Sequence, residues 1–398
     1  MRPFALVTAG PTGAQQRGPT VRSMRPTHAL ATVTLATLTS LAGLAVCFGA
    51  VATRPSFDRG IPKHLVAPAP VQAAPISQAN VAPARPANPH LTPTAPPAAL
   101  APQPPADGRD APDPFVLEDR DRWVLYSTQV ALLNVPVATA PDLATWSPPI
   151  DALPKLPAWA EWGRTWAPGV LARPGGFVLY FAARSRATGG QCIGAATSTS
   201  ATGPFASSAA QPLVCQPELG GSIDPHPFVD ADGTPYLLWK ADGNALGSAS
   251  VLFAQRLGPA GLTLAGDPVP LVQNDASWET PLIENPALVR VDERYMLLYS
   301  GGWWESDSYA TGYATCDTPL GPCTKLTTEQ PLHASDPGVA GPGGATVITG
   351  PAGDMWLAHH GWAPGVIGYA DGGARSLRFT SLQWDGAQLT VQSAPPGR

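Results

Sequence analysis

A turn followed by an aromatic, apolar segment recurs five times between residues 110 and 398. The first positions of the copies are 54, 59, 59 and 61 residues apart, and the copies are Trp123–Tyr126, Phe177–Tyr180, Tyr236–Trp239, Tyr295–Tyr299 and Trp356–His359. A Gly- or Asp-rich turn, such as Asp232-Gly233, precedes each copy. Aromatic and branched residues bounded by such turns are typical of β-strands, so each copy predicts one strand.

A second repeated unit lies upstream of each strand and consists of a proline or glycine kink followed by a short apolar run. The five units are Asp113–Val116, Ala167–Val170, Asp224–Val229, Glu284–Val289 and Gly341–Val347. No stretch of this region has convincing helical periodicity. Repeats of about 55–60 residues with several strands each are typical of propeller blades. The sequence therefore predicts an all-β, five-bladed β-propeller over residues 108–392.

Three of the five upstream units begin with a carboxylate, at Asp113, Asp224 and Glu284. The first strand of each propeller blade lines the central axis, so we expect three acids from equivalent repeat positions to converge at one mouth of the channel. Burying three carboxylates together is costly and raises at least one pKa, which is typical of a catalytic site. The alternative is that Asp-Pro forms ordinary turns in which each acid caps its own backbone.

Residues 1–53 have the pattern of an export signal. From Ala29 to Thr53 there are 25 uncharged residues, which follow Arg17, Arg22 and Arg25 and contain an Ala50-Val51-Ala52 cleavage site near their end. A cleaved signal peptide and a permanent membrane anchor both fit this pattern. The segment therefore predicts a secreted or extracellular protein, or one held at the cell surface by its N-terminus.

Residues 54–107 are predicted to be a disordered linker rich in proline and alanine. Of the 48 prolines in the chain, 13 lie in residues 61–105 together with 12 alanines. Such a composition cannot bury a core and favours extended polyproline conformations, so we expect a spacer.

The distribution of charge along the chain argues against a nucleic-acid partner. Residues 1–109 have a net charge of +7, whereas residues 110–398 have 15 basic and 27 acidic side chains. An acidic domain without a basic stripe is a poor nucleic-acid binder, and the chain has no phosphate-binding glycine loop. We therefore expect no nucleic-acid partner, and membrane contact only through an N-terminal anchor.

Four cysteines remain if the segment containing Cys47 is removed. An even number of cysteines in an exported protein predicts disulfides, and we expect the pairs Cys316–Cys323 and Cys192–Cys215. Free buried thiols are the alternative.

The order of the motifs resembles glycoside hydrolase family 43, whose five-bladed propellers act on plant polysaccharides containing arabinose and xylose. The resemblance covers about residues 108–392 and includes Asp113-Pro-Phe-Val, Trp166-Ala-Pro, Ile223-Asp-Pro, Ile283-Glu-Asn-Pro and Gly341-Pro-Gly-Gly. One departure is Asn285, where the family usually has glycine, and we expect it to alter a subsite.

The resemblance implies a role for each acid. Asp113 would be the general base that activates water, Glu284 the general acid, and Asp224 the residue that tunes the pKa and orientation of the acid. The family inverts the anomeric carbon, which needs a base and an acid about 6.5–9.5 Å apart with water between them.

Four further residues are candidates for substrate binding. His360 matches a last-blade histidine that several family members place on the axis near a bound calcium or other ion. No cofactor is required, and an axial Ca²⁺ is a further expectation with His360 as its neighbour. Trp166, Trp303 and Trp304 are candidate sugar platforms, with core packing as the alternative.

The sequence thus predicts an exported inverting hydrolase that cleaves α-L-arabinofuranoside or β-xyloside bonds. The alternative from another class is a catalytically silent carbohydrate-binding propeller at the cell surface.

Overall fold

The computed structural model describes residues 108–350 and 353–392. The predicted signal or anchor at 1–53 and the predicted linker at 54–107 lie outside these residues. Within the described part, no helix is long and apolar enough to cross a membrane.

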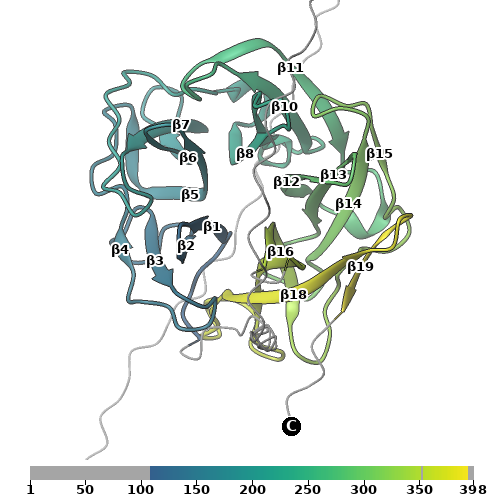
Figure 1. Cartoon of the computed structure of the whole chain (residues 1–398). Helices are drawn as coiled ribbons and strands as arrows, with labels where there is room; N and C mark the ends of the chain where they lie inside the picture. Colours follow the sequence, from purple (N-terminus) through teal and green to yellow (C-terminus); the bar gives the residue numbers. More distant parts are fainter. Residues whose placement is uncertain (1–107, 351–352, 393–398) are drawn as a thin grey trace, which may run out of the picture. The chain divides into compact units, whose positions relative to one another are not determined.

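Five antiparallel sheets surround one axis, which confirms the predicted five-bladed propeller (Figure 1). The innermost strands of blades 1 to 5 are β1 (Phe115–Asp119), β5 (Ala160–Arg173), β8 (Ser222–Val229), β12 (Ile283–Val291) and β16 (Ala340–Thr349). The second strands are β2 (Arg122–Tyr126), β6 (Gly176–Ser185), β9 (Pro235–Ala241), β13 (Arg294–Gly301) and β17 (Met355–Trp362). Both sets coincide with the two repeated units of the sequence.

The outer strands complete the blades. They are β3 (Pro136–Ala140) and β4 (Ile150–Asp151) in blade 1, β7 (Gln191–Ser198) in blade 2, β10 (Val251–Leu257) and β11 (Leu264–Gln273) in blade 3, β14 (Ala310–Cys316) and β15 (Cys323–Lys325) in blade 4, and β18 (Ser376–Trp384) and β19 (Leu389–Gln392) in blade 5. The helical segments of the described residues are single 3₁₀ turns, at Pro217–Leu219, Gly243–Leu246 and Ser277–Glu279.

The second strand of each blade is apolar on both faces because each face packs on a different neighbouring blade. In β9, Leu237 and Trp239 join the cluster between blades 2 and 3, whereas Leu238 joins the cluster between blades 3 and 4. Successive side chains of a strand point to opposite faces, so a strand between two sheets must be apolar throughout. Similar clusters fill the other three interfaces between blades.

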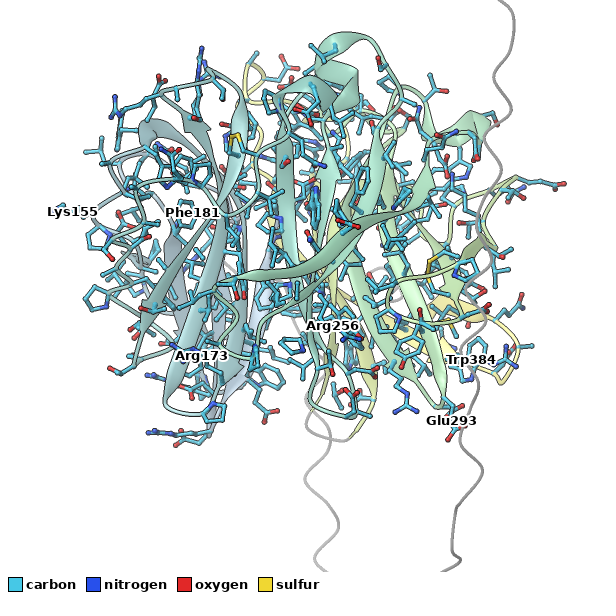
Figure 2. The ribbon with its side chains drawn as sticks, turned by 90° about the horizontal axis from the view of Figure 1, so that it is seen from above. Lys155, Arg173, Phe181, Arg256, Glu293 and Trp384 are labelled. Carbon is cyan, nitrogen blue, oxygen red and sulfur yellow. A yellow bond between two sulfur atoms is a disulfide. The ribbon has the colours of Figure 1, made fainter. Side chains whose placement is uncertain are left out.

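The first-to-second strand turns lie at one edge of the propeller. Figure 2 shows Arg173 and Glu293, which border two of these turns, at the lower edge of the ring. The starts of the inner strands, where the acidic residues lie, are therefore at the other end of the sheets.

Each inner strand contains the same irregularity, which positions the candidate site. Five residues at its start have a positive φ, between 40° and 61°, and they are Asp113, Ala167, Asp224, Asn285 and Gly344. Proline follows the first four of them. In β5, β8, β12 and β16 the pairing with the second strand shifts at this point, as in a β-bulge. All five residues line one small pocket between the inner strands.

The ring closes by contact between the two ends of the domain. Blade 1 comes entirely from the start of the domain and blade 5 entirely from its end. Across this seam Asp110 bridges Ser376, and the N–H of Ala111 donates to the carbonyl of Arg375 at 3.0 Å. The cluster between blades 1 and 5, which includes Trp123 and Phe379, covers the seam.

Both expected disulfides are present. Cys316–Cys323 joins β14 to β15 within blade 4, and Cys192–Cys215 joins β7 to the segment that follows it.

Three buried histidines around blade 5 predict a loss of stability in acid. Burial lowers the pKa of His333 to about 4 and that of His360 to about 3, and it holds the pKa of His359 well below its ordinary value. The unfolded chain takes up these protons near pH 6.5 and the folded chain does not. The free energy of unfolding should therefore fall below pH 6.5, by roughly 1.4 kcal/mol per histidine at pH 5.5.

Urea unfolding at pH 7.5 and pH 5.5 measures this effect. The variant His333→Gln should show a smaller difference between the two pH values, because it removes one titrating group. Equal free energies of unfolding for the wild type at both pH values would contradict the expectation.

Candidate active site

A cavity of about 330 Å³ collects the three predicted acids and the three predicted tryptophans. Its walls include Asp113, Asp224, Glu284, Trp166, Trp303, Trp304, Thr128, Lys240, Asp242, Asn285 and Arg375. Four of the five blades contribute acids or tryptophans through the starts of their inner strands or the loops beside them. The cavity thus brings together the predicted acids and tryptophans, whereas His360 lies behind Asp113.

One part of the predicted arrangement was wrong. Asp113 and Asp224 occupy equivalent left-handed positions, but in blade 4 that position belongs to Asn285, with a φ of 52°. Glu284 is one residue earlier, before the bulge, and pairs with Ser300 in β13. Because neighbouring strand residues point to opposite sides, Glu284 approaches the cavity from a different direction than the two aspartates.

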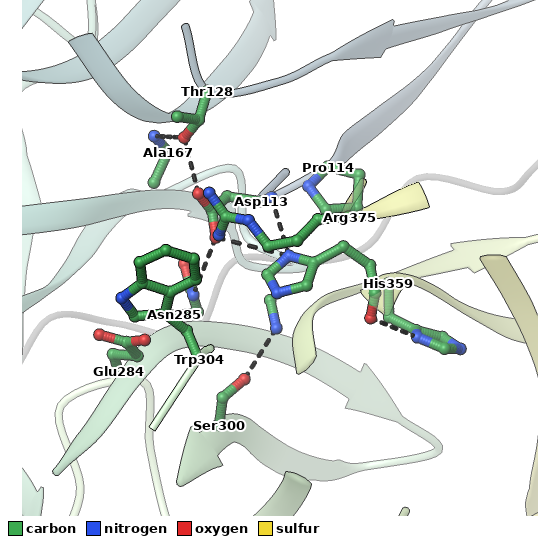
Figure 3. A network of polar contacts seen from close by, with 12 residues as sticks. Asp113, Pro114, Thr128, Ala167, Glu284, Asn285, Ser300, Trp304, His359 and Arg375 are labelled. Carbon is green, nitrogen blue, oxygen red and sulfur yellow. Dashed lines mark hydrogen bonds and ion pairs between the residues drawn. The ribbon is translucent and has the colours of Figure 1, made fainter. Parts of the chain in front are cut away.

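Asp113 is held as a carboxylate by groups from three elements (Figure 3). The hydroxyl of Thr128 donates to Oδ2 at 2.6 Å, Asn285 Nδ2 donates to Oδ1 at 3.4 Å, and Arg375 Nη1 lies 3.5 Å from Oδ1. Burial alone would raise the pKa of Asp113, but the Arg375 guanidinium and these hydrogen bonds outweigh it, so the pKa lies below its usual value. Asp113 is therefore ionised at neutral pH.

Thr128 and Arg375 are fixed in turn by their own partners. Thr128 Oγ1 accepts a hydrogen bond from the N–H of Ala167 at 2.7 Å, which ties it to blade 2. The Arg375 guanidinium lies 4.6 Å from the centre of the Trp304 ring, and its Nε donates to Tyr369 at 3.1 Å. A cation on an aromatic face adds attraction without competing for the carboxylate.

Glu284 and Asp224 form the other side of the cavity. Lys240 Nζ donates to Glu284 Oε2 at 3.0 Å, and Tyr309 donates to Oε1 at 2.9 Å. Lys240 is 1% exposed and also pairs with Asp242 at 2.9 Å. Burial and the nearby Glu284 carboxylate raise the pKa of Asp224 well above its ordinary value. Asp224 therefore retains a proton under conditions in which Asp113 has lost its own.

His360 lies at the seam between blades 1 and 5, next to Asp113. Its Nδ1 accepts a hydrogen bond from the N–H of Asp113 at 2.9 Å, and its ring stacks on Tyr309 with centroids 5.7 Å apart. A side chain on Gly344 would collide with this ring, since a Cβ there would be 2.7 Å from His360 Nδ1. The neighbouring His359 instead faces Thr380 at 2.9 Å, within blade 5.

The residues near His360 do not fit the expected calcium ion. Its Nε2 is buried without a hydrogen-bond partner in the described residues, but calcium takes six to eight oxygen ligands. In the part of the chain that the structure describes, no three His, Cys, Asp or Glu side chains gather in a metal-binding arrangement.

Sequence reasoning missed four residues that hold the acids: Thr128, Lys240, Tyr309 and Arg375. The burial of Lys240 could have been predicted, because this charged residue directly follows the apolar run Tyr236–Trp239 and lies in the same buried strand. The other three come from loops or strand ends that only the closed ring brings to Asp113 and Glu284.

Comparison with known proteins assigns the chain to a family. The family model for glycosyl hydrolases family 43 matches residues 104–387. A crystal structure of a thermostable family-43 glycoside hydrolase is 29% identical, has a TM-score of 0.64, and matches over 72% of this chain and 96% of its own.

Two curated relatives match over shorter regions. A β-D-galactofuranosidase of Aspergillus niger is 28% identical over 56% of this chain and 64% of its own length. An arabinoxylan arabinofuranohydrolase of Bacillus subtilis is 30% identical over 42% of this chain and 34% of its own length. The matched region thus spans less than two thirds of either relative. The family match extends over most of the propeller and all five blades, and the chain belongs to glycosyl hydrolases family 43.

Proposed function

We propose that the protein is an exported, inverting glycoside hydrolase that cleaves α-L-arabinofuranoside or β-xyloside bonds. The observation that carries this proposal is the convergence of three carboxyl groups from three blades, Asp113, Asp224 and Glu284, on one cavity. The pKa of Asp113 is lowered and that of Asp224 is raised. A site that keeps one carboxyl ionised and another protonated suits general acid and base catalysis.

Asp113 would act as the general base. Its ionised carboxylate accepts a proton from a water molecule as that water attacks the anomeric carbon. Thr128 and Arg375 keep the carboxylate in one orientation, so it needs no rearrangement when the proton arrives.

Glu284 would act as the general acid. A carboxylate has about four lone-pair sites, and Lys240 and Tyr309 occupy two of them. A proton can still bind at a remaining site and pass to the glycosidic oxygen as the bond breaks. Asp224, which retains its proton, avoids adding a second negative charge beside Glu284.

The substrate assignment rests on the tryptophans and on the relatives. Trp303 is 44% exposed and, with Trp166, offers a flat apolar face to a sugar ring, whereas the Trp304 ring packs on Arg375 and Trp362. One relative is named as an arabinofuranohydrolase and the other as a galactofuranosidase. The β-D-galactofuranoside ring has the configuration of an α-L-arabinofuranoside with one extra hydroxymethyl carbon, so galactofuranosides are the second candidate.

An activity panel tests the proposal directly. The full-length protein is assayed on aryl α-L-arabinofuranoside, aryl β-D-xyloside and aryl β-D-galactofuranoside, and NMR follows the anomer released first. We expect turnover of at least one substrate with inversion. Retention would exclude the mechanism, and binding without turnover on the whole panel would favour the silent carbohydrate-binding alternative.

The remaining features of the proposal concern the whole protein. We propose export because of the uncharged segment Ala29–Thr53, and a monomer that takes a polysaccharide or oligosaccharide as its substrate. Cell fractionation, followed by N-terminal sequencing of the mature protein, distinguishes a cleaved signal from a retained anchor.

A further inference from the structure

Asn285 contacts two of the three acids and adjoins the third. Its backbone N–H donates to Asp224 Oδ2 at 2.9 Å, and its side-chain Nδ2 donates to Asp113 Oδ1 at 3.4 Å. Glu284 precedes it in the chain. Figure 3 shows Asn285 between the Asp113 carboxylate and Glu284. No other residue of the cavity has hydrogen bonds to both aspartates among the described contacts.

Tyr309 extends this set of contacts to Glu284. Asn285 Nδ2 donates to the Tyr309 oxygen at 3.2 Å, and the Tyr309 hydroxyl donates to Glu284 Oε1 at 2.9 Å. Tyr309 is fully buried and stacks on His360. Burial and the Glu284 carboxylate raise the pKa of Tyr309 well above its ordinary value, so its hydroxyl remains a neutral donor.

The donors and acceptors of this chain of contacts match without a conflict. The Asn285 amide has two N–H groups, one for Asp113 and one for Tyr309. The single hydroxyl hydrogen of Tyr309 then points to Glu284. The chain ends on a carboxyl group at each side, and hydrogen bonds in such a buried series polarise one another.

We propose that Asn285 and Tyr309 are positioning residues that form one bridge between the catalytic base and acid. The bridge holds Asp113 and Glu284 at the separation that an attacking water and a glycosidic bond require. This inference rests on the proposed function, because it assigns a task to the bridge only if Asp113 and Glu284 are the base and the acid.

The fold explains why asparagine suits this position. The site requires a left-handed backbone, with a φ of 52°, which asparagine tolerates better than most residues. Gly344 occupies the equivalent position in blade 5, between Asn285 and Asp113 around the ring. A Cβ on Gly344 would lie 3.3 Å from Asp113 Cα, so glycine keeps this part of the ring close to Asp113.

Asn285→Gly tests the bridge, since glycine accepts the left-handed backbone and retains the N–H that binds Asp224. We expect kcat to fall about 10- to 100-fold, as for loss of a hydrogen bond to a charged group. Losing this donor also destabilises the ionised form of Asp113. The acidic limb of the pH–rate profile should therefore move to higher pH, by about half a unit or more.

Several titratable groups face the bridge and also influence the pKa of Asp113, on which the acidic limb depends. They come from β8, β9, β12, β17 and the loops before β1 and β18, and they are Asp113, Asp224, Lys240, Glu284, His360 and Arg375. None of them is changed in Asn285→Gly. Asn285→Asp is the second variant: it replaces the donor by a carboxylate, so the acidic limb should move further in the same direction.

Tyr309→Phe tests the contact between the bridge and Glu284. It keeps the ring on His360 and removes only the hydroxyl. We expect kcat to fall about 10-fold or more with a poor leaving group and less with dinitrophenol, since the effect passes through the proton donor. The double variant should lose about as much rate as the worse single variant, because one bridge can be broken only once.

Arg120→Gly is the matched control. Arg120 is exposed in the turn between β1 and β2 and has a φ of 63°, so the same kind of change is made far from the cavity. The control should keep wild-type kinetics. The bridge would be refuted if Asn285→Gly kept kcat within twofold of wild type and left the acidic limb unmoved. It would also be refuted if Arg120→Gly lost as much activity as Asn285→Gly. Losses that multiply in the double variant would show that the two residues act independently and would refute it too. A wild type inactive on every glycoside would instead refute the proposed function.

Discussion

Asp113→Asn is expected to lower kcat about 10²- to 10⁴-fold on every glycoside, whatever its leaving group. The amide cannot accept a proton, so the attacking water is no longer activated. The loss should not depend on the leaving group, because water must attack in every case. Steady-state kinetics on a nitrophenyl and a dinitrophenyl glycoside of the preferred sugar measure this.

The fold should survive this substitution, since asparagine tolerates the φ of 50° at this position. Asp119→Asn is the control, because Asp119 ends β1 in the same blade and pairs with Arg122 away from the cavity. Asp113→Gly adds a further test: azide needs no deprotonation and should restore turnover with a glycosyl azide of inverted configuration. A variant with kcat near wild type would remove Asp113 from the role of base.

Glu284→Gln is expected to show the opposite dependence on the leaving group. With natural linkages or alkyl glycosides, kcat should fall about 10²- to 10⁴-fold, because an alkoxide leaves poorly without a proton. With a dinitrophenyl glycoside the loss should be small, since dinitrophenolate is stable without protonation. The ratio of the two rates, compared between variant and wild type, is the measurement.

Glutamine keeps the size of the side chain, but Lys240 and Tyr309 donate to different oxygens of Glu284, so the single carbonyl oxygen of glutamine can accept from only one of these two positions. A large effect on both substrates would mean that Glu284 holds the site together without giving a proton. In that case Asp224, with its raised pKa, would be the proton donor to test next.

The fold was predictable because its main signal is local. Each second strand is apolar on both faces, as Leu237, Leu238 and Trp239 illustrate, and a repeat of such strands identifies blades directly. The acids and tryptophans were found because they lie beside these repeats. The position of Glu284 in its repeat was predicted wrongly because the three carboxylates were aligned with one another. Alignment of the prolines would have placed Asn285, not Glu284, opposite Asp113 and Asp224.

The residues that surround the acids could not be predicted from the sequence, for a physical reason. Arg375 comes from a loop 262 residues after Asp113, and its approach depends on closure of the ring. Tyr309 and Thr128 are ordinary residues at strand ends, and their donors acquire a target only in the assembled cavity. The sequence contains the parts of the site, but the distances between blades determine which parts meet.

The seam between blades 1 and 5 has a consequence for the timing of activity. Asp113 is among the first residues of the propeller to be synthesised, whereas His360 and Arg375, which hold it, are among the last. A nascent chain that stops short of blade 5 therefore has Asp113 without the contacts of His360 and Arg375. The enzyme should become competent in a single late step, when its final blade docks, and truncated products of translation should be inert.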